Sequence, residues 1–423
     1  MNLQQRDKLV NWHPYTQMKT AEDAVPIVKG KGVYLFDDKG KQYIDAVSSW
    51  WVTLHGHAHP YIAQKVSEQL HTLEQVIFAG FTHQPAIQLS ENLLKLLPDN
   101  QEKVFYSDNG STAVEVALKM CIQFAHNQGK KKTKILAFKD AYHGDTFGAM
   151  SVSGRSIWTK PFGDMLFDVT FIDTPTSENL QSLQSQISHI ADEIACFIYE
   201  PLVQGAAGML MHNPEDLSEL MKFCKKQNIL LIQDEVFTGF GRTGKLFAAN
   251  YLTEKPDIMC FSKGLTGGTM PMGITTSSNK IFNAFLSEDK YKTLFHGHSF
   301  TANPLACTAA LASMELLLNK ETQDNIRLIT EKHKEFSQIL SQHPKVENVR
   351  QTGTILAWDI KTEQDTSYFN LVGKFFYKEF LNKGIIMRPL GNVMYLVPPY
   401  CITAEDMEYI YQTILQVLQI KPN

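Results

Sequence analysis

Long hydrophobic runs, closely spaced cysteines and an excess of one charge are all missing from this sequence. None of its apolar stretches is long enough to cross a membrane, and residues 1–7 lack the apolar core of a secretory signal. Its 40 basic residues against 44 acidic ones leave a net charge of -4, which provides no basic surface for nucleic acid. The six cysteines are scattered without a C-x-x-C pair, so neither a zinc knuckle nor a disulfide framework is indicated. We therefore expect a cytoplasmic globular protein with reduced thiols.

The middle of the chain alternates short apolar runs with helical periodicity. Continuous apolar runs of this length predict strands that are buried on both faces. We expect such strands at 103–106, 134–138, 169–172, 195–199, 229–232, 258–261 and 273–276. Helical spacing separates several of them, at 114–125, 178–190 and 214–227. This alternation predicts an α/β fold with a large, mostly parallel sheet and helices on both faces.

The two ends of the chain have a different pattern. Residues 33–45 predict a β-hairpin that turns at 37–40. After residue 319 the pattern is helix, short strands, helix, more strands and a final helix at 404–418. We therefore expect a large domain at 48–318 and a smaller α+β domain that combines 1–47 with 319–423.

Polar residues follow the first of the predicted strands, at the sheet edge where open parallel sheets bind ligands. Thr112 and Glu115 fit a capping box that begins the next helix. Gly110 and Ser111 would then leave free N–H groups and a hydroxyl at the positive end of that helix, which suits a phosphate. Taken alone, a plain capped helix is the simpler interpretation.

A lysine, a pair of acids and an aromatic residue follow three other strands. Lys263 leaves a buried strand ahead of a glycine loop, and low dielectric would favour its free amine, which could form a Schiff base. Asp234 and Glu235 end another strand, and only one of them can enter a given site because strand side chains alternate. Tyr142 could stack on a planar ligand. A solvent-reaching lysine, a helix-cap acid and a packing aromatic are the plainer interpretations.

Together these four features match one cofactor. Pyridoxal phosphate needs a phosphate cradle, a lysine, an acid facing the pyridine nitrogen and an aromatic ring against its face. Each of these parts follows a predicted strand, so parallel packing would gather them at one edge.

Two further motifs point to other chemistry, and neither is complete. Residues 239–245 come close to a nucleotide-binding phosphate loop, but Leu246 stands where a magnesium-binding hydroxyl belongs. Arg242 in this stretch could instead line a pocket or orient the site. The stretch 55–59 holds three histidines, yet no carboxylate or thiolate lies at a supporting spacing. We expect loop histidines and no metal site, with a nucleotide hydrolase as the less favoured alternative.

The chain resembles the class III, fold-type I pyridoxal-phosphate aminotransferases over nearly its whole length. The matching motifs are Gly110-Ser111, Tyr142-His143-Gly144, Glu200-Pro201, Asp234-Glu235-Val236 and Phe261-Ser262-Lys263-Gly264. The resemblance implies that Lys263 holds the cofactor and moves a proton, and that Asp234 pairs with the pyridine nitrogen. It also implies that Gly110 and Ser111 bind the phosphate and that Tyr142 packs on the ring.

Other stretches resemble one branch of that class, which acts in biotin synthesis. They are Trp12–Thr16, Ser48–Trp51, Ile386–Pro389 and Tyr395–Tyr400. The resemblance implies a ping-pong reaction that converts 8-amino-7-oxononanoate to 7,8-diaminononanoate with S-adenosylmethionine as amino donor. Lysine as donor, another ω-amine transaminase and a catalytically silent cofactor-binding regulator are the alternatives.

The same branch assigns residues to a substrate pocket. Tyr15, Trp50 and Tyr142 would line the pocket, with Tyr15 also among the catalytic residues. Arg388 would bind the carboxylate of the keto-amine substrate, since a long apolar molecule with one distant anion needs aromatic walls and one arginine.

The turn Gly297-His298-Ser299 stands where the family has a second phosphate-binding turn. In this fold type that turn reaches the cofactor of the neighbouring subunit, so the resemblance implies a homodimer with shared active sites. Close relatives often carry Pro and Thr at the last two positions. Ser299 keeps the hydroxyl, while His298 is a departure from the pattern.

Overall fold

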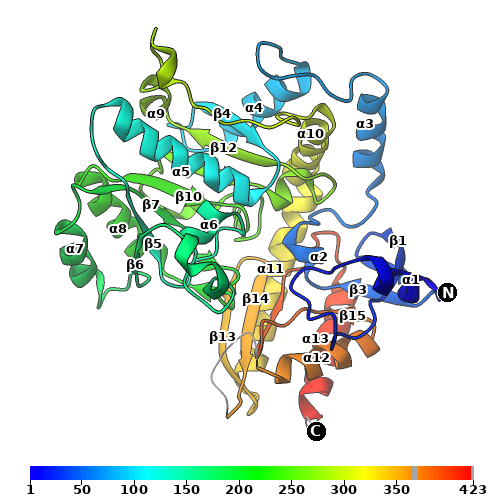
Figure 1. Cartoon of the computed structure of the whole chain (residues 1–423). Helices are drawn as coiled ribbons and strands as arrows, with labels where there is room; N and C mark the ends of the chain where they lie inside the picture. Colours follow the sequence, from blue (N-terminus) through cyan, green and yellow to red (C-terminus); the bar gives the residue numbers. More distant parts are fainter. Residues whose placement is uncertain (364–369, 421–423) are drawn as a thin grey trace.

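A seven-stranded sheet forms the centre of the larger part of the protein (Figure 1). The structure is a computed structural model that describes residues 1–363 and 370–420. The strands are, in sheet order, β4 (Lys103–Ser107), β12 (Gly273–Ser277), β11 (Ile258–Phe261), β10 (Leu230–Asp234), β7 (Ile194–Tyr199), β5 (Lys134–Phe138) and β6 (Val169–Ile172). All seven predicted strands are present, and β10 extends far enough to include Asp234.

The sheet is mostly parallel, as predicted. The four neighbouring pairs from β11 to β6 are parallel, and β12 is antiparallel to both β11 and β4. Asp234 of β10 pairs with Cys260 of β11, which fixes how the ends of these two strands lie relative to each other.

Helices cover both faces of this sheet because alternate strand residues are apolar on each face. Along β5, Ile135 and Ala137 share a core with α5 (Gly110–Asn127). Leu136 and Phe138 share another core with helices α7 and α8 on the opposite face. These two helices are α7 (Leu180–Ser188) and α8 (Pro214–Lys226).

The two ends of the chain lie together and their strands pair. β2 (Tyr34–Asp37) and β3 (Gln42–Asp45) form the predicted hairpin, and β15 (Ile385–Ile386) adds to β3 in parallel. With β1 (Ile27–Lys31) they form a sheet of order β1-β2-β3-β15. Figure 1 shows the blue N-terminal strands beside the orange and red C-terminal helices. The predicted smaller α+β part made from both termini is therefore present.

The remaining elements complete these layers. A three-stranded antiparallel sheet contains β13 (Val346–Thr352), β14 (Ile355–Ile360) and β16 (Val393–Leu396), and β8 (Val203–Gln204) pairs with β9 (Leu210–Met211). The other α-helices are α1 (Leu3–Val10), α2 (Ser48–Trp51), α3 (Pro60–Leu70), α4 (Gln84–Leu96), α6 (Phe147–Ser151), α9 (Asn279–Asn283), α10 (Pro304–Leu318), α11 (Lys320–Ser341), α12 (Val372–Asn382) and α13 (Ala404–Gln419). Short 3-10 helices are η1 (Lys160–Met165), η2 (Ala248–Tyr251), η3 (Lys263–Thr266) and η4 (Lys290–Lys292). Within 1–363 and 370–420, no helix is both long and apolar enough to span a membrane.

The start of α5 differs from the prediction. Its capping residue is Asn109, whose side chain accepts the N–H of Thr112 (2.9 Å), while the Thr112 hydroxyl accepts the N–H of Asn109 (3.1 Å). The expected box of Thr112 with Glu115 is therefore wrong. Glu115 instead accepts two backbone N–H groups of α6, at 2.7 and 3.1 Å. Both boxes fit the sequence, and the tertiary contact with α6 decides between them.

Candidate active site

Lys263 and Asp234 lie at the same edge of the large sheet. Asp234 is the last residue of β10, and Lys263 follows the end of the neighbouring strand β11. The Nζ atom of Lys263 is 4.9 Å from the centre of the Trp51 ring and 5.8 Å from that of Phe237. Burial lowers the pKa of the Lys263 amine, and nearby carboxylates act in the opposite direction. The amine is thereby brought closer to the neutral form that a nucleophile or base requires.

A buried histidine holds Asp234 in place. The Nδ1–H group of His143 donates to Asp234 Oδ2 (2.7 Å), and the N–H of Val236 donates to Oδ1 (2.9 Å). His143 Nε2 is buried and has no hydrogen-bond partner in the described part of the chain. Glu235 has a separate set of backbone and side-chain donors, around η2 and Thr238. One of the two adjacent acids therefore enters the site, as strand alternation predicts.

Glu200 is another buried carboxyl beside this pair, and no role of its own follows from the sequence. Its two oxygens accept the N–H groups of Tyr142 (2.9 Å) and Gly205 (3.1 Å). Burial raises the pKa of Glu200 to about 7, while the charge of His143 lowers it. Glu200 thus fixes the backbone of Tyr142 next to Asp234. The Glu200-Pro201 dipeptide is the signal in the sequence for this position.

The first turn of α5 lies against the same edge of the sheet. A methyl group at Gly110 would be 2.7 Å from the Val236 side chain, so a larger residue could not bring the helix start this close. The N–H groups of Gly110 and Ser111 have no acceptor within the helix, and the turn carries no acidic side chain. Ser111 Oγ accepts the N–H of Thr146 (3.0 Å). This arrangement suits a phosphate.

Three aromatic side chains that were predicted to line a substrate pocket lie together, although they come from distant parts of the chain. Tyr15 Oη donates to Asp145 Oδ2 (2.5 Å) and is 3.5 Å from Tyr142 Oη. The Tyr15 ring meets Trp50 edge to face, with 5.8 Å between ring centres. It also meets Trp158 edge to face at 5.6 Å. Asp145 and Trp158 were not predicted, because no spacing in the sequence relates them to Tyr15.

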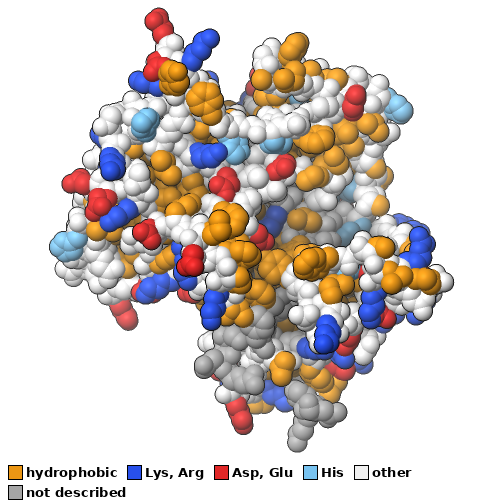
Figure 2. All heavy atoms as spheres, in the orientation of Figure 1, with side chains coloured by type: hydrophobic (Ala, Val, Ile, Leu, Met, Phe, Trp, Pro, Cys, Tyr) orange, Lys and Arg blue, Asp and Glu red, His pale blue; other side chains and the backbone are white. Residues whose placement is uncertain are grey.

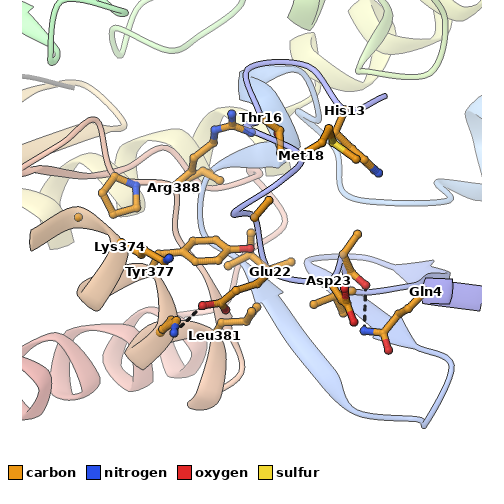
Figure 3. Close-up of a pocket in the computed structure, with 18 of the residues that line it drawn as sticks. Gln4, His13, Thr16, Met18, Glu22, Asp23, Lys374, Tyr377, Leu381 and Arg388 are labelled. Atoms are coloured by element: carbon orange, nitrogen blue, oxygen red, sulfur yellow. Dashed lines mark hydrogen bonds and ion pairs between the residues drawn. The ribbon is translucent and has the colours of Figure 1, made fainter. Parts of the chain in front are cut away.

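Arg388 stands at one end of this aromatic row. Its guanidinium carbon is 4.1 Å from the centre of the Trp50 ring. A cavity of about 650 Å³ opens between the N-terminal segment and α12, and Arg388 and Ser49 belong to its lining. In Figure 3, Arg388 points toward the segment that carries Thr16. Figure 2 shows that the surface is hollowed in the middle of this face. Arg388 therefore borders a cavity whose lining does not include Trp50, Tyr15 or Lys263.

The turn that carries the two tryptophans is strained and is held from several sides. Ser48, Ser49 and Trp51 have positive φ angles of 51°, 61° and 66°. Asp45 accepts the N–H of Ser49 (2.7 Å), and Arg242 Nη2 donates to the carbonyl of Trp51 (3.4 Å). Because Arg242 is buried, it supports this turn and does not line a pocket. Strain of this kind persists only where neighbouring contacts fix the backbone, and it clusters at functional sites.

The turn at 297–299 lies on a largely exposed loop before α10. Its Ser299 carbonyl accepts a hydrogen bond from Gln75, and its His298 ring accepts the N–H of Phe300. None of its contacts within the described residues is with Lys263 or with the start of α5. The structure of a single chain therefore does not bring this turn to the other predicted site residues.

The histidines at 55–59 face different partners. His55 Nε2 is 3.1 Å from Ser313 Oγ, and His57 Nε2 is 2.9 Å from Asp45 Oδ2. In the part of the chain that the structure describes, no group of three or more His, Cys, Asp or Glu side chains is arranged to hold a metal ion.

Comparison with known proteins identifies the family. A family model described as Aminotransferase class-III matches residues 16–418. The chain belongs to the class-III aminotransferases. A relative from Synechococcus elongatus is 45% identical over 417 residues, which cover 96% of this chain and 98% of the relative. A relative from Staphylococcus aureus is 37% identical and covers 96% and 95%. Both are named adenosylmethionine-8-amino-7-oxononanoate aminotransferase.

Solved aminotransferase structures have the same fold. The Methanocaldococcus jannaschii enzyme of the same name has a TM-score of 0.95 at 36% identity, covering 99% of this chain and 98% of that one. A PMP-bound aminotransferase from Vibrio fluvialis has a TM-score of 0.92 at 27% identity, with coverage of 99% and 98%. The predicted fold type is therefore confirmed.

As a class-III aminotransferase, the protein is an enzyme that uses pyridoxal 5′-phosphate. Its residues fit this cofactor. The N–H groups at the start of α5 that have no acceptor within the helix suit the phosphate, and Asp234 with the His143 ring bonded to it forms a buried polar pair. The lowered pKa of Lys263 suits an amine that reacts with an aldehyde.

Proposed function

We propose that this aminotransferase converts 8-amino-7-oxononanoate to 7,8-diaminononanoate in biotin biosynthesis, with S-adenosylmethionine as amino donor. The observation that carries the proposal is the position of Arg388 against Trp50, whose ring meets that of Tyr15. The next residue along the chain, Trp51, lies 4.9 Å from Lys263 Nζ. A long apolar acceptor with one remote carboxylate matches this row and its terminal cation. The names of the S. elongatus and S. aureus relatives support the same substrates.

The buried residues carry the proton chemistry. Bound pyridoxal phosphate supplies an aldehyde that takes up the amino group and a ring that withdraws electrons. Lys263 Nζ holds the cofactor and, once released, accepts the proton from the substrate carbon and returns it. Asp234, fixed by His143, keeps a proton on the pyridine nitrogen. Gly110 and Ser111 bind the phosphate.

The aromatic residues hold and orient the substrate. Tyr142 packs on the ring of the cofactor, and the carboxyl of Glu200 fixes its backbone. Tyr15 and Trp50 form the wall along which the apolar chain of the acceptor lies. Arg388 binds the carboxylate of the acceptor through charge-assisted hydrogen bonds.

The site is completed by a second copy of the chain. In a homodimer, Gly297, His298 and Ser299 of one copy would reach the phosphate of the other. The exposed apolar side chains around this turn support such a contact, with Phe295 at 71% and Phe300 at 64% exposure. Mixing a Lys263→Ala protein with a Ser299→Ala protein should then restore activity above that of either variant. Mixtures with no gain would contradict shared sites.

The remaining parts of this proposal concern organisation and location. Residues 48–318 would form the cofactor-binding domain, and 1–47 with 319–423 the smaller domain, part of which lies outside the described residues. The six cysteines are unpaired and five of them are buried, which supports a reducing, cytoplasmic location.

The decisive experiment is a turnover assay. The cofactor-loaded enzyme is incubated with 8-amino-7-oxononanoate and either S-adenosylmethionine or lysine, and 7,8-diaminononanoate is measured by mass spectrometry. We expect product with S-adenosylmethionine. Product with lysine but not with S-adenosylmethionine would show that lysine is the amino donor. Transfer to simple ketones, with no product from 8-amino-7-oxononanoate, would identify a different ω-amine transaminase.

A further inference from the structure

The loop at 155–167 brings an additional aromatic side chain to the substrate wall. Arg155 closes the two ends of this loop, since it donates to the carbonyl of Ser151 (2.9 Å) near one end and to that of Phe167 (3.3 Å) at the other. Its guanidinium also lies 5.0 Å from the Phe171 ring centre. Between these ends, Trp158 reaches the ring of Tyr15. The anchored loop therefore holds Trp158 at a defined place beside the pocket.

Tyr15 has two aromatic neighbours, Trp50 and Trp158. Trp50 carries the guanidinium of Arg388 on its ring. Trp158 contacts Tyr15, whose hydroxyl is bonded to the carboxylate of Asp145. The three rings are 37–41% exposed, so each offers surface to a ligand. The Trp50 end of the row therefore favours an anion, and the Trp158 ring offers an aromatic face to a cation.

The two proposed substrates carry opposite charges away from their reacting groups, the donor between its amino-acid part and its adenosine. Both must present their reacting group to Lys263, but the acceptor ends in a carboxylate and the donor carries a sulfonium ion. Arg388 attracts the carboxylate and repels the sulfonium. The sulfonium group therefore needs a surface other than the Arg388–Trp50 end of the wall. An aromatic face attracts such cations.

We propose that Trp158 determines donor specificity by receiving the cationic part of S-adenosylmethionine, while Trp50 and Arg388 receive the acceptor. This inference rests on the proposed function, because it takes the two substrates from there. Trp50 and Trp158, the two aromatic neighbours of Tyr15, then serve the two half-reactions of a ping-pong enzyme.

The test separates the half-reactions in the holoenzyme. Stopped-flow absorbance of the bound cofactor gives the apparent Kd of S-adenosylmethionine in one half-reaction and of 8-amino-7-oxononanoate in the other. In Trp158→Ala we expect about tenfold weaker donor binding and less than a twofold change for the acceptor. Trp158→Phe keeps an aromatic face and should recover most of the donor affinity.

A matched control lies on the same loop. Phe162 packs on Phe147, with 6.0 Å between ring centres, so Phe162→Ala should leave both half-reactions unchanged. A second readout uses binding alone. Competition with the neutral thioether S-adenosylhomocysteine gives the preference for the sulfonium over the thioether, which should fall toward unity in Trp158→Ala.

Several outcomes would overturn the inference. They are equal losses for donor and acceptor in Trp158→Ala, no loss for either, an unchanged sulfonium preference, or the same loss in Phe162→Ala. Failure of the proposed function looks different, because the wild-type enzyme itself would then not take an amino group from S-adenosylmethionine. In that case the assignment of Trp158 to a sulfonium group would be overturned as well.

Discussion

Two regions of the candidate active site differ in burial, in charge and in the origin of their residues. The buried base consists of Lys263, Asp234, His143 and Glu200, and the aromatic wall consists of Tyr15, Trp50, Trp158 and Arg388. His143, Asp234 and Glu200 are 3–5% exposed and follow strands of one sheet, whereas the three rings of the wall are 37–41% exposed. The wall residues come from both chain ends and from a loop in the middle.

We infer that this difference separates chemistry from recognition. Proton transfer requires charges that are held at fixed positions in a low dielectric, and the ends of buried strands provide such positions. Recognition of a substrate tolerates change more easily when its residues lie on loops. We therefore expect substitutions in the buried base to lower the turnover rate with every substrate. Substitutions in the aromatic wall should lower it for the donor or for the acceptor, but not for both.

The largest effect is expected in the base, at Lys263. Lys263→Ala removes both the attachment point and the proton-transfer group, so kcat should fall by about a thousandfold or more. Steady-state turnover with any accepted donor measures this loss. Lys255→Ala changes an exposed lysine that pairs with Asp99, and it should have no effect. A kcat of Lys263→Ala within tenfold of the wild-type value would show that a different residue transfers the proton.

Asp234→Asn should have the next largest effect. The amide keeps the shape of the side chain but removes the charge that stabilises a protonated pyridine nitrogen, so kcat should fall about 100- to 1,000-fold for both half-reactions. A pH titration of the absorbance of the bound cofactor should shift in the same variant. An unchanged rate and an unchanged titration would argue against a role for the His143–Asp234 pair.

Arg388→Ala tests the wall. Loss of charge-assisted hydrogen bonds worth about 1.5–3 kcal/mol should lower kcat/KM for 8-amino-7-oxononanoate roughly 10- to 150-fold. The cofactor dissociation constant and the donor half-reaction should stay within twofold of wild type. If donor and acceptor lost efficiency together, the division between base and wall would be wrong. Arg388→Lys should recover part of the acceptor affinity.

The smallest expected effect is a change in the pH dependence of stability. The pKa of Glu200 is raised from 4.5 to about 7, so the folded protein binds more protons than the unfolded chain between these values. The contribution of Glu200 to the free energy of unfolding is therefore present below pH 4.5 and is lost as the pH rises through 7. Glu200→Gln should remove this part of the slope in a series of thermal melts at different pH. The exposed Glu219→Gln is the control, and an unaltered slope in Glu200→Gln would count against the raised pKa.

The strand positions could be predicted from the sequence because strands buried on both faces must be apolar throughout. The same reasoning places Asp234 and Lys263 at one edge, since the ends of parallel strands meet there. The predicted capping box of α5 was wrong because two overlapping boxes fit the same stretch of sequence. Only the contact of Glu115 with α6 distinguishes them.

The site residues that could not be predicted from the sequence depend on long-range packing. Trp158 and Asp145 reach Tyr15 across more than 125 residues of chain, and no local pattern encodes such a contact. Glu200 acts through the backbone of Tyr142, so its residue type gives no direct indication of what it holds. The strained turn at 48–51 likewise depends on Arg242 and Asp45 from other segments.

We propose that Lys263, within the buried base, is the residue that holds the cofactor and transfers the proton. Reduction of the purified, cofactor-bound enzyme with borohydride, followed by peptide mass spectrometry, tests it most directly. We expect a phosphopyridoxyl group on the peptide that contains Lys263, and none in Lys263→Ala. A label on a different lysine, or no label on an enzyme that is active, would contradict it.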